Sequence, residues 1–452
     1  MILPTVVALS KSLAALAIGL DKRPELIAHL TKRGASAGGD SETGERITLV
    51  ENSANVIREA FKKCLSERSG NASGLDSNGK PEGRRIGIYL TANLCLKLFF
   101  HCKKLRSAEQ VFSNIHQQSP PLALFPASQR VTFLYYLGRY HFANNHFFRA
   151  QLALQAAYNK CHRRCAKQRC LILIYLITSN IVLGRFPSRK LLERTEAQDL
   201  GKKFLPVCDS IKKGDLVTFK SLLSLDNESA GWFLSKRILL QLSNRCEVLV
   251  WRSLARRIFI LSGTQGDATS KRAPTLDLLD MLTLAIYFEK QILGLSSSSA
   301  DSNSHSNQRA HTNSIFLVQP SSKSIDTMNG ELDERNGYVD PDLKDVVEPS
   351  GPDLPTMEVI ESIFASLIEQ DLLHGFISHK SQKFAITGSK TTGALQAGFP
   401  NIWETISGKA DSEVPGWVMQ EEKSKGGGLG GNFGSGRVVN LTGARPVGAG
   451  PA

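Results

Sequence analysis

Short segments with helical periodicity, separated by brief turns, follow one another over residues 103–242. Apolar residues recur within each segment at the spacing that puts them on one face of a helix. Small residues stand where two neighbouring segments would face each other, namely Gly138 in one and Ala150, Ala153 and Ala157 in the next. Antiparallel helices that approach closely need such residues, as in tetratricopeptide-like repeats. The pattern therefore predicts a mainly α protein with a solenoid of helical hairpins, its helices near residues 105–116, 131–142, 147–161, 168–183, 216–225 and 230–242.

A different pattern begins after residue 245. Residues 246–261 form a predicted helix with three arginines on its outward face, and residues 276–291 and 357–372 form two more. Residues 375–379 and 383–387 then alternate at a period of two around a polar turn, which is typical of a short β-hairpin. Three helices and a hairpin predict a winged helix.

Composition divides the chain into four predicted parts. Residues 1–130 form an N-terminal helical region with flexible loops, and residues 131–245 form the helical repeats. The winged-helix part covers residues 246–388, interrupted at 296–355 by a Ser-rich, acidic insert whose composition cannot support a packed core. Residues 389–452 are expected to be a Gly-rich flexible tail, with Trp403 and Trp417 anchoring short pieces of it onto a surface.

Two features favour a reducing compartment and no membrane insertion. The apolar first twenty residues lack a basic start and contain Lys11, so we interpret them as an amphipathic structural helix, not as a signal peptide or membrane span. The eight cysteines include no Cys-x-x-Cys pair, which is unlike a disulfide framework or a common zinc site.

Positive charge is concentrated in the predicted folded middle of the chain. The formal net charge is +13, and residues 131–294 carry 25 Lys and Arg against 12 Asp and Glu. Residues 295–354 carry 4 against 10, which sets the acidic insert apart. A positive surface raises the local concentration of polyanions and acidic proteins, so these are the predicted partners.

The basic residues of the winged helix form a candidate nucleic-acid surface. They lie on its first helix, before its second helix and around its wing: Arg252, Arg256, Arg257, Lys271, Arg272, His379, Lys380 and Lys383. If these side chains converge, they would contact nucleic-acid backbone, which needs charge and little sequence readout. The alternative is a solvated basic face that keeps the domain soluble.

A second basic cluster comprises Lys160, Arg163, Arg164, Lys167 and Arg169, at the turn between two predicted solenoid helices. We interpret it as charge that complements the carboxyl end of a helix, in preference to a binding patch. Cys161, His162, Cys165 and Cys170 lie in the same stretch, but their spacing matches no standard zinc arrangement. Cys161 and Cys165 would share a helix face, so buried thiols are favoured over a metal site.

Several runs of the middle of the chain resemble one protein family. They are Tyr135 to Tyr140 (YYLGRY), Ala156 to Arg163 (AAYNKCHR), Leu171 to Ile177 (LILIYLI), Leu183 to Pro187 (LGRFP) and Leu373 to His379 (LHGFISH). In this order they are similar to the PCI-domain protein 2 family, which includes fungal proteins called COP9 signalosome subunit 12-like. The resemblance extends over residues 93–387, and the insert departs from the family pattern.

The resemblance implies a right-handed helical solenoid followed by a winged helix, together called a PCI domain. It also implies a subunit of the transcription-and-export complex 2, which acts in messenger-RNA export coupled to transcription. The implied partners are a large scaffold subunit, a small acidic and largely unfolded subunit, RNA, and double-stranded DNA as a second nucleic-acid ligand. The implied location is the nucleus, including the nuclear pore, with a cytoplasmic fraction.

No local sequence motif indicates catalysis or a cofactor. The glycine-rich stretch 428–436 neither follows a buried strand nor ends in the Lys-Ser or Lys-Thr of a phosphate-binding loop, so it is interpreted as a linker. Nucleophile-elbow, HExxH and JAMM signatures are absent from the sequence. We therefore expect a non-catalytic scaffold or adaptor. The alternative is a structural subunit of a COP9-signalosome-like or proteasome-lid-like assembly that binds no nucleic acid.

Overall fold

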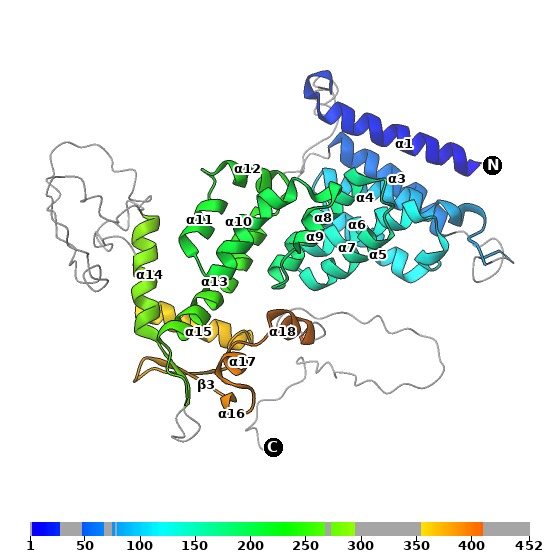
Figure 1. Cartoon of the computed structure of the whole chain (residues 1–452). Helices are drawn as coiled ribbons and strands as arrows, with labels where there is room; N and C mark the ends of the chain where they lie inside the picture. Colours follow the sequence, from blue (N-terminus) through cyan, green and yellow to red (C-terminus); the bar gives the residue numbers. More distant parts are fainter. Residues whose placement is uncertain are drawn as a thin grey trace, which may run out of the picture. The chain divides into compact units, whose positions relative to one another are not determined.

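The computed structural model describes residues 2–27, 48–66, 75–76, 79–266, 273–293 and 354–409, all within one compact unit of residues 1–410. Residues 296–353 of the predicted insert and residues 410–452 of the predicted tail, with Trp417 and the stretch 428–436, lie outside the described residues. The described part is mainly helical, as the sequence predicts, with one small antiparallel sheet (Figure 1).

The N-terminal helices share their own hydrophobic core. It is formed by α1 (Ile2–Asp21), α3 (Leu49–Leu65), α4 (Ile88–His101) and α5 (Leu105–Gln118), with two 3-10 helices at Pro24–Ile27 and Gly83–Gly87. Helix α1 packs on α3 and α4 through Val7, Ala14 and Ala17. Its other face leaves Leu9 and Leu16 exposed. By length and composition α1 is long and apolar enough to cross a membrane, the one such helix in the described ranges.

Helical hairpins continue the chain, as the sequence predicts. Their helices are α6 (Ala127–Ala143), α7 (Phe147–Lys160), α8 (Ala166–Val182), α9 (Arg189–Leu192), α10 (Leu200–Lys213), α11 (Leu216–Leu223) and α12 (Glu228–Ser235), with 3-10 helices at Leu122–Leu124 and Thr195–Ala197. The predicted close approach of small residues is present between α6 and α7. A Cβ atom on Gly138 would lie 2.5 Å from Cγ of Leu154, and Ala150 and Ala157 are fully buried beside it.

The winged helix follows in the predicted order. It comprises α13 (Leu239–Ser262), β1 (Thr275–Asp277), α14 (Leu278–Ile292), α15 (Met357–Glu369), β2 (Gly375–Ser378) and β3 (Lys383–Ile386). The hairpin β2–β3 is confirmed, and β1 adds a third strand in the order β1-β3-β2.

Two boundaries differ from the sequence prediction. The predicted helix from residue 276 begins at Leu278, because residues 275–277 pair with β3 and the Asp277 side chain caps the helix by accepting from Leu279 N. The predicted helices 230–242 and 246–261 are instead α12, which ends at Ser235, and one long helix, α13. Buried Leu242 and Cys246 continue its packed face across the expected break.

Residues 389–409 are folded, contrary to the predicted flexible tail. They form α16 (Ser389–Thr392), α17 (Ala394–Gly398) and α18 (Ile402–Gly408). A Cβ atom on Gly184, just after α8, would lie 2.5 Å from Ile402, so α18 packs directly on the end of the solenoid helix. The predicted anchoring by Trp403 is confirmed, because its ring lies 5.8 Å from Phe148 and 4.4 Å from the Arg185 guanidinium.

Candidate nucleic-acid interface

Arg252 is not part of the outward basic face, which corrects the sequence prediction. Its side chain is buried, with Nε donating to the carbonyl of Leu372 at 3.1 Å and an Nη donating to the carbonyl of Pro400. Burial, with a smaller contribution from Arg256, lowers its pKa from 12.5 to about 10, so the guanidinium remains charged at neutral pH. Arg252 therefore ties α13 to the segments after α15 and α17, and it is unavailable to a ligand.

Arg256 and Arg257 are exposed, as predicted, one helical turn further along α13. Arg257 donates to the carbonyl of Lys213, the last residue of α10, at 3.2 Å. This bond brings the exposed arginines next to Lys212 and Lys213, which are also exposed. The basic surface around α13 thus includes the end of the solenoid as well as the winged helix.

The wing forms a second, separate basic group. His379 and Lys380 lie in the turn between β2 and β3, and Lys383 is the first residue of β3. All three are exposed, but Nδ1 of His379 lies 2.8 Å from a carboxylate oxygen of Glu361, so acidic charge offsets part of the group. Within the described ranges, no hydrogen bond or ion pair joins the wing residues to Arg256 or Arg257. Lys271 and Arg272 lie outside the described residues.

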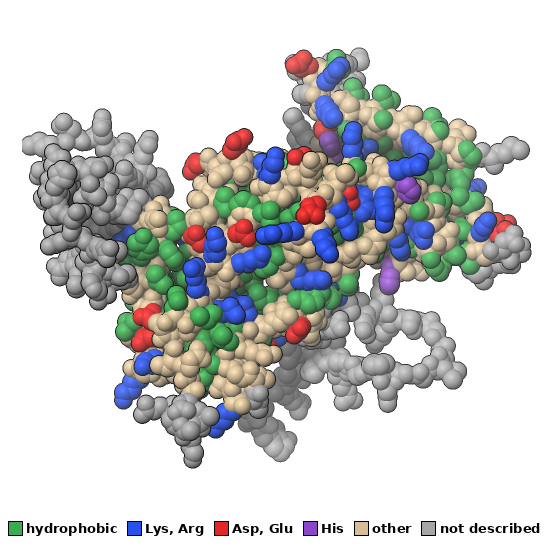
Figure 2. All heavy atoms as spheres, viewed as in Figure 1, with side chains coloured by type: hydrophobic (Ala, Val, Ile, Leu, Met, Phe, Trp, Pro, Cys, Tyr) green, Lys and Arg blue, Asp and Glu red, His purple; other side chains and the backbone are tan. Residues whose placement is uncertain are grey.

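Basic side chains extend well beyond the winged helix. Figure 2 shows Lys and Arg side chains gathered in a band from the region of α13 and α10 toward α6 and α4, with fewer acidic side chains among them. Such a band creates a positive potential along an extended part of the surface. An extended polyanion can contact all of it, whereas a ligand with a single negative charge cannot.

The second basic cluster contains a structural residue. Arg169 is buried, and its Nη1 donates to the carbonyls of Cys161, at 2.8 Å, and Tyr158, at 3.3 Å, at the carboxyl end of α7. Its Nε lies 2.9 Å from a carboxylate oxygen of Glu196, and both side chains are 9% exposed. The preferred interpretation, charge at a helix carboxyl end, is confirmed for Arg169. Lys160, Arg163, Arg164 and Lys167 are exposed.

The cysteines beside this cluster do not share a helix face. Cys161 is buried and directly follows α7, whereas Cys165 is exposed and directly precedes α8. Because the chain turns between them, neither residue lies within a helix, and the expectation of a buried thiol is wrong for Cys165. Among the described residues, no three His, Cys, Asp or Glu side chains are placed together to hold a metal ion.

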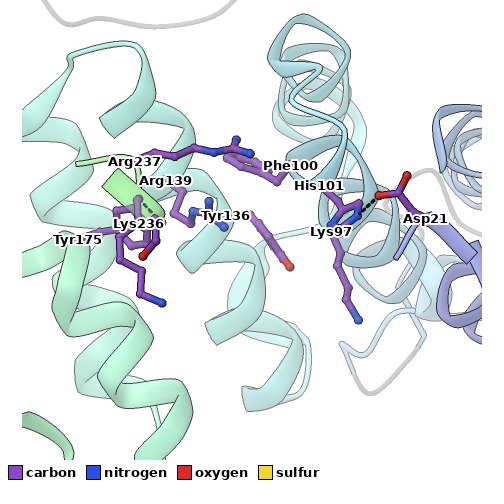
Figure 3. Close-up of a pocket in the computed structure, with 10 residues that line it drawn as sticks. Asp21, Lys97, Phe100, His101, Tyr136, Arg139, Tyr175, Lys236 and Arg237 are labelled. Carbon is purple, nitrogen blue, oxygen red and sulfur yellow. Dashed lines mark hydrogen bonds and ion pairs between the residues drawn. The ribbon is translucent and has the colours of Figure 1, made fainter. Parts of the chain in front are cut away.

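A basic cleft in the solenoid was not predicted from the sequence. Its cations are Lys97 on α4, Arg139 on α6, and Lys236 and Arg237 in the turn from α12 to α13 (Figure 3). These residues are separated by 42 or more positions except for the last two, so no local charge cluster indicates the site. The one sequence signal related to this cleft is the regional excess of positive charge from residue 131 onward.

Comparisons with known proteins agree with this fold. No protein-family model matches the chain. It is 31% identical over 225 residues to a PCI domain-containing protein of Schizosaccharomyces pombe, which covers 50% of this chain and 48% of the relative. It is 34% identical over 226 residues to a CSN12 homolog of Neurospora crassa, covering 48% of this chain and 46% of the relative.

A vertebrate protein is also similar. The chain is 26% identical over 236 residues to PCI domain-containing protein 2 of Danio rerio, covering 52% of this chain and 53% of the relative. The chain thus spans about half the length of the curated relatives it matches. Over about half its length the chain is therefore similar to proteins named PCI domain-containing protein 2 and CSN12 homolog, the family that its sequence motifs resemble.

Proposed function

We propose that this protein is a non-catalytic PCI-domain scaffold subunit of a nuclear complex for transcription-coupled messenger-RNA export. Its partners are a large scaffold subunit, a small acidic subunit and nucleic acid, and its location is the nucleus, including the nuclear pore, with a cytoplasmic fraction. The proposal rests on the similarity to PCI-domain protein 2 over half the chain. The basic surface around Arg256 and Arg257 adds physical support for the nucleic-acid partner.

A surface that binds the nucleic-acid backbone requires exposed positive charge and does not require a pocket. Lys and Arg side chains that neutralise phosphates release condensed counterions, so affinity falls steeply with salt and depends little on base sequence. Arg256 and Arg257 are suited to this because both are exposed, and within the described residues neither forms an ion pair with an Asp or Glu. Lys380 and Lys383 on the wing provide a second contact of the same kind.

The test replaces Arg256 and Arg257 together by Glu in the full chain. We expect weaker binding to a labelled RNA, with a slope of log affinity against log salt that is shallower by about 1.4, from two lost single-strand contacts. Lys62 and Lys63 on α3, also exposed, changed to Glu provide a control with the same change in net charge. Equal RNA affinity and salt slope for both variants would contradict the nucleic-acid surface.

A second experiment tests the complex itself. Affinity purification from nuclear extract is expected to recover an export scaffold subunit and a small acidic protein. Recovery of COP9-signalosome or proteasome-lid subunits in their place would support the alternative of a structural subunit. We keep this alternative because the similar protein of Neurospora crassa is named CSN12 homolog.

A further inference from the structure

The cleft between the N-terminal helices and the solenoid has a volume of about 460 Å³. It is lined by residues of α1, α4, α6 and α8 and by the turn from α12 to α13. In Figure 3 the Arg237 side chain extends from that turn toward Phe100 on α4, Arg139 lies on α6 between them, and Lys97 and Lys236 stand on the two sides. The cleft is separate from Arg256 and Arg257, which do not line it.

Arg139 is held on the floor of the cleft by aromatic rings. Its guanidinium carbon lies 4.9 Å from the ring centres of both Phe100 and Tyr175 and 5.6 Å from that of Tyr135. Phe100 and Tyr175 are themselves buried, so the rings restrict the guanidinium. Cation–π contacts fix its position without neutralising its charge. Arg139 is thus preorganised to donate to an oxyanion.

Arg237 occupies a backbone position that favours glycine. It follows α12 with φ of 57°, and the bonds from Arg237 N to Leu234 O and from Ile238 N to Phe233 O close the helix end. A left-handed residue at this position is usually Gly, because a Cβ atom is strained there. The Tyr175 hydroxyl also donates to the carbonyl of Lys236 at 3.1 Å, which fixes the turn at the edge of the cleft. The chain thus holds an arginine at a strained position beside Arg139.

Positive charge outweighs negative charge in the cleft, where four Lys and Arg side chains share the lining with one Asp. Lys97, Arg139, Lys236 and Arg237 form no ion pair with any Asp or Glu in the described part of the chain. The acidic residue that lines the cleft, Asp21, is bound to His101 at 2.7 Å. Four cations that face one open cleft repel one another, and a bound anion would relieve this repulsion.

We propose that the cleft binds the phosphodiester backbone of single-stranded RNA. No lining residue is an exposed large apolar side chain, whereas a bound protein segment usually buries apolar anchors. RNA carries one negative charge on every nucleotide and can bind through its phosphates without apolar anchors, which fits this lining. The cleft is far too small for a duplex, so a single strand is the form that enters. The proposal deepens the proposed function, because it adds a second RNA contact away from the winged helix.

The test uses the full chain with Lys97→Gln and Arg237→Gly together. Glycine at 237 removes the cation and fits the left-handed backbone, so the fold is kept. We expect affinity for a labelled oligouridylate to fall at least about fivefold and the salt slope to become shallower by about 1.4. The thermal midpoint should stay equal or rise, and affinity for an RNA duplex of the same length should not change.

The matched control is Lys62→Gln with Lys103→Gly. Lys103 also has a positive φ, 63°, and neither control residue lines the cleft. Unchanged oligouridylate affinity in the cleft variant, or an equal loss in the control, would overturn the proposal. Loss of binding to a polyglutamate peptide without loss of RNA binding would also overturn it, because the cleft would then be a protein site. If Arg256→Glu with Arg257→Glu still weakens RNA binding in these cases, the proposed function stands without the cleft.

Discussion

Replacing Glu196 by Gln is expected to lower the free energy of unfolding by about 3 kcal/mol at pH 7. The Glu196 carboxylate accepts from Nε of Arg169 at 2.9 Å and from the Tyr158 hydroxyl at 2.8 Å. The guanidinium of Arg169 also lies 4.0 Å from the centre of the Tyr158 ring. This buried group of three side chains joins the end of α7 and the start of α8 to the 3-10 helix at Thr195–Ala197.

The magnitude follows from the pKa of Glu196. Burial alone would raise that pKa, but hydrogen bonds from its own backbone N–H, Arg169 and Tyr158 outweigh burial and lower it from 4.5 to about 2. Each pKa unit corresponds to about 1.4 kcal/mol, so the charged form is favoured in the fold by roughly 3 kcal/mol over a neutral form. Gln keeps the shape of the side chain and removes the charge.

The pH dependence has a defined sign. Because the pKa is lowered in the folded state, the stabilisation is complete above the unfolded pKa near 4.5 and is lost as pH falls from there toward 2. Differential scanning calorimetry at pH 7 and pH 3 measures both effects, and for a chain of this size we expect a midpoint lower by about 4 °C at pH 7. At pH 3, between the two pKa values, the difference between the parent and Glu196→Gln should shrink to about 1.4 kcal/mol, and it should vanish only below pH 2.

Glu193, exposed and three positions earlier, provides the control as Glu193→Gln. Its midpoint should match the parent protein at pH 7. An equal midpoint for Glu196→Gln and the parent, or an equal decrease in both variants, would refute the reasoning from the buried ion pair.

Three further substitutions test other parts of the structure by thermal unfolding. Arg252→Met should destabilise the fold by about 2–4 kcal/mol, because the carbonyls of Leu372 and Pro400 lose their donor. RNA affinity, measured below the temperature of thermal unfolding, should stay unchanged. A loss of RNA affinity without a loss of stability would contradict the buried role of Arg252. Gly138→Ala should destabilise by about 1–3 kcal/mol through contact with Leu154, whereas Gly231→Ala on α12, with nothing within 4 Å, should be neutral or stabilising. Burial, with the charges of His146 and Arg149, lowers the pKa of His141 from 6.5 to about 4, so the parent should lose about 2 kcal/mol as pH falls through this range. His141→Phe should abolish that loss, and an unchanged pH profile would contradict the assignment.

Much of the architecture was predictable from local pattern. Gly138, Ala150 and Ala157 indicated the close pair α6 and α7, and alternation at period two indicated the hairpin β2–β3. The strand β1 was missed, because three residues before a helix contain too few alternations to show a period. Its formation depends on pairing with β3 more than a hundred residues later.

For the candidate binding residues, the sequence pattern alone does not distinguish buried from exposed arginines. Arg252 and Arg256 are one helical turn apart and would lie on one face of an isolated α13, so helical spacing alone assigns them the same environment. In the folded protein, Leu372 and Pro400, which are distant in the sequence, pack against Arg252 and bury it, whereas Arg256 is exposed to solvent.

Periodicity, turn residues and regional charge specify a basic helical solenoid with a winged helix, because helices and hairpins depend on neighbours within a few positions. Long-range packing decides which cations are buried, where residues 389–409 dock, and that Lys97, Arg139 and Arg237 share one cleft. These three features depend on contacts between segments that are far apart in the sequence. A side chain becomes buried only when those contacts form, so local sequence pattern cannot predict its burial.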